Sequence, residues 1–263
     1  SRACLLRVLV LLLTLGVALP AGATIAAAQT TSTLNAAGQT AAGQQSAASQ
    51  TASIVAAAPQ PPLADGRVML QGFYWESYRH GLVPGYGQHR WYEIVRQKAG
   101  AIAEAGFDLI WLPPPSWAGE RSAGYNPKQY FKLSNSYGDA LQQRALLVAL
   151  LQAGIEPVAD IVINHRDGND GWADFRNPSW GLWSICRSDE AFSRRESGIA
   201  GTPSSQRGNC EEPETYRAGG TYNYADFRDI AHTDPRVRAD IIRYLLQLRS
   251  IGYRGWRYDM VHG

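Results

Sequence analysis

Short apolar runs alternate with longer amphipathic segments from Arg67 to the end of the chain. The short runs predict strands because they are rich in β-branched and aromatic residues and are bounded by glycine or polar positions. They cover Val68–Tyr74, Phe107–Leu112, Ile155–Ile163 and Tyr253–Asp259. A regular alternation of strands and helices predicts a parallel sheet covered by helices.

The three segments between these runs have the hydrophobic spacing of helices. The first places Trp91, Ile94, Val95, Lys98, Ile102 and Ala105 on one face; the second begins at Asp139 and shows Leu141, Ala145, Val148 and Ala149; the third has Asp234 as its N-cap and Pro235 in its first turn, followed by Val237, Ile241, Leu245 and Leu248. A glycine follows each segment, at Gly106, Gly154 and Gly252, as a left-handed C-cap favours.

The spacing of these glycines indicates an insertion. Gly106 and Gly154 are about fifty residues apart and Gly154 and Gly252 about a hundred, in a fold in which one β/α unit averages about thirty. The extra residues lie between Asn164 and about His232 and are rich in Gly, Trp, Asn, Asp and Arg. We therefore expect three parts in the folded region: 65–163 with the first three strands, an inserted subdomain at 164–232, and 233–263 with the last helix and strand.

A large insertion after the third of four strands favours an α/β fold of the (β/α)8 TIM-barrel type, with only strands 1–4 present. Four strands cannot close a barrel of eight. We therefore expect a fragment that lacks the second half of its domain, which would follow Gly263. A doubly wound open sheet is the alternative. It is disfavoured because no Gly-x-Gly-x-x-Gly follows any predicted strand.

The first residues have the pattern of a secretory signal peptide. Arg2 and Arg7 accompany an apolar run, Val8–Leu19, which is too short for a comfortable membrane span, and small residues follow up to Ala28. We expect residues 1–28 to be removed, which leaves a protein that is secreted, extracellular or periplasmic and has no membrane contact. An uncleaved anchor is the alternative.

Residues 29–64 consist mainly of Ala, Gln, Ser, Thr, Gly and Pro without charges, so we expect a disordered linker. Loss of the leader removes Cys4 and leaves Cys186 and Cys210 in a compartment that permits disulfides. The sequence leaves open whether these two cysteines pair.

Charge and composition exclude some partners and favour others. Lys and Arg number 25 against 23 Asp and Glu, and the net charge of +2 is scattered, so nucleic acid is not an expected partner. The 8 Trp and 13 Tyr suit ligands that combine an apolar face with many hydroxyls, as sugars do, although most of these rings must belong to the core.

Polar side chains gather at the ends of the third and fourth predicted strands. Residues two apart on a strand share a face, so Arg257 and Asp259 should point the same way. The guanidinium would keep Asp259 ionised, as a nucleophile requires, although a purely structural ion pair is equally compatible. Asp160 and Asn164 should also share a face.

A cation site is the second hypothesis. The Asn164 amide oxygen is a ligand type that Ca²⁺ accepts, and the insertion adds carboxylates at Asp189, Asp226 and Asp229. Turn formation is the simpler explanation for Asp and Asn in loops.

These same stretches resemble a known family. Asp160-Ile-Val-Ile-Asn-His165 and Gly255-Trp-Arg-Tyr-Asp259 are similar to the first and second signature stretches of the α-amylase family of glycoside hydrolases. The plant-type members are resembled in particular by Gln71-Gly-Phe-Tyr-Trp-Glu76, Trp111-Leu-Pro-Pro-Pro115 and Gly124-Tyr-Asn-Pro127. The resemblance covers roughly Gly66 to Gly263.

The resemblance implies retaining endo-hydrolysis of α-1,4-glucans such as starch, glycogen and maltodextrin, by a monomer that uses Ca²⁺. Asp259 is similar to the catalytic nucleophile and Arg257 to the arginine that orients it. Tyr125, His165 and His262 resemble substrate-binding residues. The family's general acid, a Glu after a fifth strand, has no counterpart here, so we expect the segment to be inactive without the missing half.

The resemblance also implies the metal ligands. Asn164 and Asp229 resemble side-chain calcium ligands, Gly263 a backbone ligand, and Asp189 and Asp226 ligands of an additional calcium. An aspartate that the family carries shortly before Ala-Asp-Phe is not reproduced in Thr221–Asp226. A non-catalytic glucan-binding descendant and a related α-glucan transglycosylase are the alternative functions.

Overall fold

The computed structural model describes residues 66–193, 198–211 and 227–260. The chain divides into two compact units, 1–59 and 60–263, and the first lies outside the described residues, as do the whole predicted leader and the whole predicted linker. The described residues all belong to the second unit.

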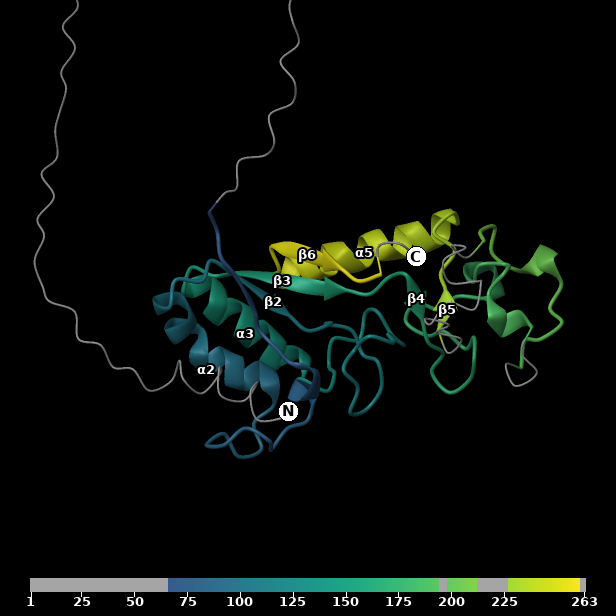
Figure 1. The fold of residues 1–263 in the computed structure, drawn as a ribbon. Coiled ribbons are helices and arrows are strands. Elements are labelled where there is room, and N and C mark those ends of the chain that lie inside the picture. The colour runs from purple at the N-terminus through teal and green to yellow at the C-terminus, as the bar shows by residue number, and fades with distance from the viewer. Residues whose placement is uncertain (1–65, 194–197, 212–226, 261–263) are drawn as a thin grey trace, which may run out of the picture. The chain divides into compact units, whose positions relative to one another are not determined.

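A parallel sheet of four strands forms the centre of this unit (Figure 1). Its strands are β1 (Met69–Gln71), β2 (Leu109–Leu112), β3 (Glu156–Ile161) and β6 (Gly255–Tyr258), in the order β1-β2-β3-β6. Met69 pairs with Leu109, Leu109 with Glu156 and Val158 with Gly255. The predicted strands and their parallel arrangement are confirmed, although each strand is shorter than its apolar run.

In the described ranges, three α-helices lie between the strands: α2 (Trp91–Glu104), α3 (Ala140–Gln152) and α5 (Pro235–Ile251). Helices α2 and α3 lie side by side (Figure 1). The Asp139 side chain accepts from Gln142 N in a capping box, and Asp234 accepts from Arg236 N. The glycines predicted to end the helices have positive φ angles of 84°, 80° and 130° at Gly106, Gly154 and Gly252.

The buried face of α3 differs from the predicted one. Leu141 and Val148 are 78% and 51% exposed, whereas Leu146, Leu147, Leu150 and Gln143 are buried. Nearly every turn of this helix carries a leucine, so periodicity cannot select a face. The choice follows from the neighbours, because the buried Gln143 amide donates to the hydroxyls of two buried tyrosines, Tyr92 and Tyr253.

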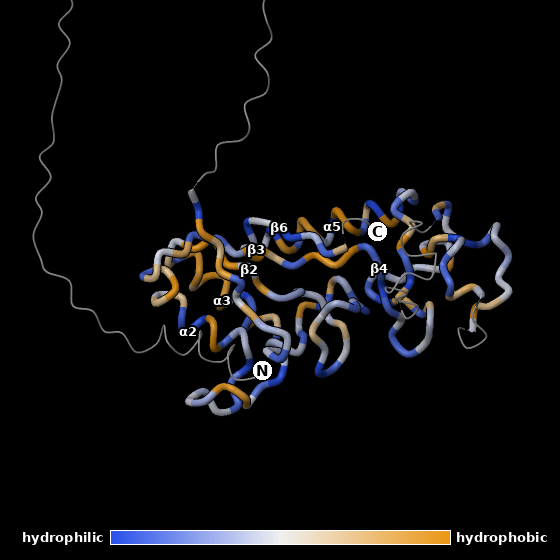
Figure 2. The backbone as a smooth tube through the Cα atoms, viewed as in Figure 1, coloured by the Kyte–Doolittle hydropathy of each residue, from blue (hydrophilic) through white to orange (hydrophobic). Residues whose placement is uncertain are grey.

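The other two helices bury most of the predicted positions. On α2, Trp91, Ile94 and Val95 are buried, but Ala105 is exposed. On α5, Val237, Ile241, Tyr244, Leu248 and Ile251 are buried. Hydrophobic positions are concentrated along the strands and the helices that cover them (Figure 2).

The chain between β3 and α5 is held by short pairings. Strand β4 (His165–Arg166) pairs antiparallel with β5 (Arg228–Asp229). Between them lie the 3₁₀ helices η2 (Leu182–Ser184), η3 (Glu190–Phe192) and η5 (Ser204–Gln206). A disulfide joins Cys186 and Cys210, which answers the question that the sequence left open. The subdomain boundaries 65–163, 164–232 and 233–263 stay a prediction.

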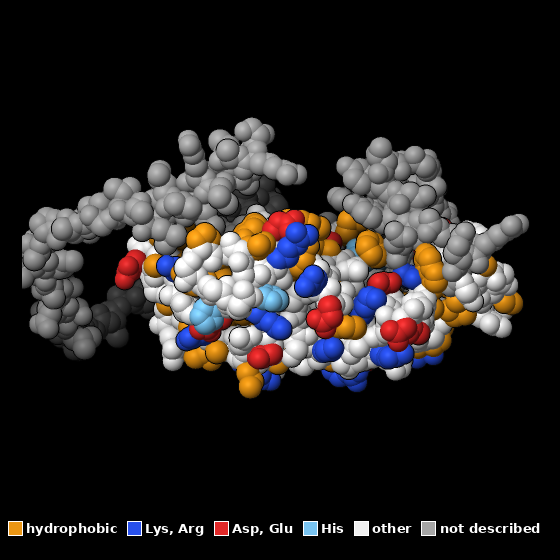
Figure 3. Space-filling view, turned by 90° about the horizontal axis from the view of Figure 1, so that it is seen from below, with side chains coloured by type: hydrophobic (Ala, Val, Ile, Leu, Met, Phe, Trp, Pro, Cys, Tyr) orange, Lys and Arg blue, Asp and Glu red, His pale blue; other side chains and the backbone are white. Residues whose placement is uncertain are grey.

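Two further features of the described residues are the distribution of charged side chains on the surface and the apolar character of the helices. Basic and acidic side chains are interspersed on the face shown in Figure 3. Among the described residues, no helix combines the length and the apolar character that a membrane crossing requires.

Candidate active site

Asp160 is the centre of a hydrogen-bonded group at the carboxyl ends of three neighbouring strands. It lies on β3 and has no exposed surface. Its carboxylate accepts from Trp111 Nε1 on β2 at 3.1 Å, from the Tyr125 hydroxyl at 2.7 Å and from Arg257 Nη1 on β6 at 2.9 Å. Three donors therefore hold one buried carboxylate.

Arg257 connects this buried carboxylate to Asp259. Its Nη1 donates to Asp259 Oδ1 at 2.7 Å as well as to Asp160, so the two residues share a face, as strand alternation predicted. The Asp259 side chain is 17% exposed, and its backbone N–H donates to the Ile161 carbonyl at 2.9 Å. Asp259 is thus fixed at the strand end and remains accessible.

The electrostatics of this group follow from burial and pairing. Burial raises the pKa of Asp160, although hydrogen bonds from Tyr125 and Arg257 oppose the shift. Burial lowers the pKa of Arg257, but its bonds to Asp160 and Asp259 outweigh this effect and raise that pKa overall. Burial and the Asp160 charge raise the pKa of Tyr125. Arg257 is therefore a permanent cation between two acids, and Tyr125 keeps its proton.

His165 is tied to the same loop as Tyr125. Its Nε2 lies 2.7 Å from the Tyr125 carbonyl oxygen, which can only accept, so the proton is on Nε2. The ring stacks on Phe227 with centroids 4.8 Å apart, and burial lowers the pKa of the imidazole. His165 is therefore a buried neutral imidazole that fixes Tyr125, and its Nε2 proton is already engaged.

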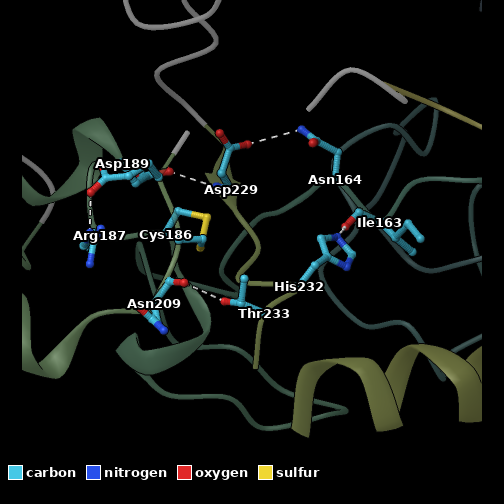
Figure 4. The surroundings of a disulfide bond; sticks show 11 residues. Ile163, Asn164, Cys186, Arg187, Asp189, Asn209, Asp229, His232 and Thr233 are labelled. Atoms are coloured by element: carbon cyan, nitrogen blue, oxygen red, sulfur yellow. Dashed lines mark hydrogen bonds and ion pairs between the residues drawn. A yellow bond between two sulfur atoms is a disulfide. The ribbon is translucent and has the colours of Figure 1, made fainter. Parts of the chain in front are cut away.

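Asn164, Asp189 and Asp229 form a second polar group (Figure 4). Strand β3 ends at Ile161, so Asn164 does not continue the face of Asp160; instead its Nδ2 donates to Asp229 Oδ1 at 3.2 Å. Asp189 accepts from Asp229 N and from Ala191 N, both at 2.8 Å. This group joins the start of the insertion to its end.

These residues have donors suited to a hard cation. Burial raises the pKa of Asp189 to about 7, and within the described ranges no Lys or Arg forms an ion pair with it. Turning the Asn164 amide would present its oxygen beside the Asp229 carboxylate. Carboxylate and amide oxygens are the ligands that Ca²⁺ takes, and backbone carbonyls and water complete its shell. Among the described residues, no group of three or more His, Cys, Asp or Glu side chains is placed so that it could hold a metal ion.

The predicted site residues thus fall into two groups. Asp259, Arg257, Tyr125 and His165 are linked by hydrogen bonds, and Asn164, Asp189 and Asp229 by others. Asp226, His262 and Gly263 lie outside the described residues. Asp160 and Trp111 were not assigned a role from the sequence. The signal in the sequence was the single acid, Asp160, within an otherwise apolar strand. Its hydrogen-bond donors Tyr125 and Arg257 lie 35 and 97 residues away along the chain, so the pattern could not reveal them.

A parallel β/α sheet with polar and acidic side chains gathered at its carboxyl edge is the arrangement in which barrel enzymes hold their active sites. The family model for the alpha amylase catalytic domain matches residues 93–263. The chain belongs to the alpha-amylase family, and the sheet therefore contains four of the eight strands of a TIM barrel.

Individual proteins similar to this chain are also named alpha-amylases. The chain is 31% identical to chloroplastic alpha-amylase 3 of Arabidopsis thaliana over 198 residues, which are 74% of this chain and 20% of that protein. It is also 31% identical to probable alpha-amylase 2 of the same plant, over 76% of this chain and 43% of the relative. The crystal structure of alpha-amylase I from Eisenia fetida superposes with a TM-score of 0.50 at 15% identity, over 73% of this chain and 37% of that one. The chain thus spans less than half the length of each of these relatives.

Proposed function

We propose that this chain supplies the nucleophile side of an α-amylase site, which hydrolyses α-1,4-glucans such as starch, glycogen or maltodextrin with retention of configuration. The observation that carries the proposal is Arg257, which pairs with the buried Asp160 on one side and with the accessible Asp259 on the other. The relatives named alpha-amylase support the substrate class.

In this proposal each residue has one task. The Asp259 carboxylate attacks the anomeric carbon, and Arg257 orients it through their 2.7 Å hydrogen bond. Tyr125 offers its ring to the sugar while its hydroxyl is held by Asp160. His165 positions Tyr125 through the bond from its Nε2 to the Tyr125 carbonyl, and His262 contributes on the leaving-group side. A Glu from a further strand of the parent protein protonates the leaving oxygen.

The test uses a substrate that needs no general acid. An α-maltosyl fluoride loses fluoride without protonation, so the nucleophile alone can open it. We expect fluoride release, which a fluoride electrode measures. We also expect a glycosyl adduct on the peptide that carries Asp259, which mass spectrometry detects. Asp259→Asn should abolish the adduct, and the exposed control Asp170→Asn should keep it. An adduct on any other residue, or no reaction, would refute the assignment.

The second part of the proposal is a structural Ca²⁺ held by Asn164, Asp229 and the Gly263 carbonyl, with Asp189 and Asp226 holding an additional ion. When bound, the ions would neutralise the carboxylates that hold them and join the insertion to the barrel. Saturating Ca²⁺ at about 100 times its Kd should stabilise the protein by about 2.7 kcal/mol. Thermal unfolding with Ca²⁺ and with chelator measures this, and Asp229→Ala should remove the difference.

Residues 1–28 are proposed as a cleaved secretory leader and 29–64 as a disordered linker, in a monomeric extracellular or periplasmic protein. The disulfide supports this compartment because such bonds persist in oxidising surroundings. Amino-terminal sequencing of the secreted protein tests the cleavage, and a first residue before Ala21 would contradict it.

A further inference from the structure

Arg166 is a buried cation that the functions above do not use. It lies on β4 directly after His165 and has no exposed surface. Arginine is almost never fully buried without a paired acid, because removing a charge from water is costly. The ion pairs found among the described residues do not include Arg166. Burial lowers the pKa of Arg166 to about 10, so the guanidinium keeps its charge at pH 7 and must be stabilised in another way.

The guanidinium lies over three aromatic rings. Its central carbon is 5.0 Å from the ring centroid of Tyr130, 4.9 Å from that of Phe175 and 4.8 Å from that of Trp180. The faces of aromatic rings carry partial negative charge and attract a cation most strongly where water is excluded. Tyr130 belongs to the loop between β2 and α3, and the other two rings belong to the insertion. The charge is therefore shared between two parts of the chain.

The hydrogen bonds of Arg166 join the same two parts. Nη1 donates to the Pro178 carbonyl at 2.9 Å, and Nη2 donates to the Lys128 carbonyl at 2.8 Å and to the Arg176 carbonyl. Pro178 and Arg176 lie in the insertion, whereas Lys128 lies in the loop between β2 and α3. The planar fork of an arginine can serve carbonyls on two sides, and the single nitrogen of a lysine cannot reproduce it.

The loop bonded by Arg166 carries the proposed sugar-binding residue Tyr125. Three consecutive residues of the insertion base hold the carbonyls of residues 125–128. His165 Nε2 lies 2.7 Å from the first of these carbonyl oxygens, Asp167 N donates to the third at 3.0 Å, and Arg166 Nη2 donates to the fourth. The place of the Tyr125 ring over the sheet edge therefore depends on how firmly this base holds the loop.

We propose that Arg166 is a positioning residue for substrate binding: its guanidinium, held by three carbonyls and three aromatic rings, fixes the loop that carries Tyr125. The inference rests on the proposed function, because the position of Tyr125 matters only if its ring contacts a sugar. Arg166 itself has no exposed surface, so it touches no substrate and acts through Tyr125. Replacement by lysine should therefore weaken sugar binding even though the positive charge is kept.

The experiment measures the affinity for maltopentaose by isothermal titration calorimetry, with the full chain carrying Asp259→Asn so that no turnover occurs. Adding Arg166→Lys should weaken binding about tenfold. Tyr125→Ala should also weaken it. Because Arg166 acts through Tyr125, adding Arg166→Lys to the Tyr125→Ala chain should change the affinity by less than about twofold.

Controls separate positioning from loss of stability. Leu147→Ala removes a buried side chain from α3 and destabilises the protein through a cavity, but it should bind maltopentaose as the Asp259→Asn chain does. Circular dichroism confirms that each variant is folded at the titration temperature. If Arg166→Lys does not fold, Phe175→Leu, which keeps the arginine and removes one ring, should show a smaller loss of affinity that also disappears in the Tyr125→Ala chain.

Two results would overturn the inference and leave the proposed function intact. One is an unchanged affinity after Arg166→Lys or, where that variant does not fold, after Phe175→Leu. The other is an equal loss with and without Tyr125→Ala, which would mean that the arginine does not act through Tyr125. If the Asp259→Asn chain binds no maltopentaose at all, the proposed function fails together with the inference.

Discussion

Loss of the Asp160 carboxylate should destabilise the protein far more than loss of an equally close surface ion pair. Asp160→Ala removes the acceptor shared by Trp111, Tyr125 and Arg257 and leaves a buried cavity. Breaking a buried pair from one side costs about 3–5 kcal/mol. Since the Arg257 side chain is 36% exposed and water can reach it, we expect the lower end, about 3 kcal/mol.

Asp170 provides the matched control. Its carboxylate lies 2.9 Å from Arg176 Nη2, the same distance as in the Asp160–Arg257 pair, but its side chain is 77% exposed. Asp170→Ala should therefore cost less than about 1 kcal/mol. The two pairs share their distance and differ in burial, so their comparison isolates the effect of desolvation.

Urea unfolding at pH 7 measures both variants. With a slope of about 2 kcal/mol per molar urea, Asp160→Ala should lower the midpoint by about 1.5 M and Asp170→Ala by less than about 0.5 M. Asp160→Asn, which keeps the shape and one acceptor, should fall between them. Equal midpoints for Asp160→Ala and Asp170→Ala would refute the view that Asp160 holds the strand ends together.

Two further predictions concern stability. Burial lowers the pKa of His165 below its ordinary 6.5, so the unfolded chain binds a proton at this imidazole more tightly than the folded chain does. The free energy of unfolding should therefore decrease as the pH drops from 6.5 towards the pKa in the folded protein. Urea unfolding of His165→Gln should show a smaller decrease over the same pH range. The disulfide spans 24 residues, so the double variant Cys186→Ser/Cys210→Ser should lose about 3 kcal/mol. In thermal unfolding, a reductant should lower the melting temperature of the native protein and leave that of the double variant unchanged. An equal decrease in both proteins would contradict this.

The strands and helix ends were predictable because local signals determine them. The apolar runs gave four parallel strands, and Asp139, Asp234 and the three helix-ending glycines gave the helix boundaries. The buried face of α3 was not predictable from leucines distributed all round it. Gln143 is buried there because Tyr92 and Tyr253 satisfy its amide, and both tyrosines are distant in sequence.

The candidate site was predictable in part. Strand alternation correctly paired Arg257 with Asp259, two residues away. It misplaced Asn164, because β3 ends at Ile161 and the chain then turns towards Asp229. That turn depends on pairing between two-residue strands, which are too short to leave a periodic pattern. The role of Asp160 depends likewise on Tyr125, which reaches it from a loop 35 residues earlier.

The pairing of β4 with β5 joins the two ends of the segment between β3 and α5. His165 faces Asp229 and Arg166 faces Arg228, so the outgoing and returning chain are fastened together at the base. The entropy of closing a loop rises only slowly with its length. The length of the segment between the two strands can therefore change at little cost in closure entropy, while the pairing keeps His165 opposite Asp229.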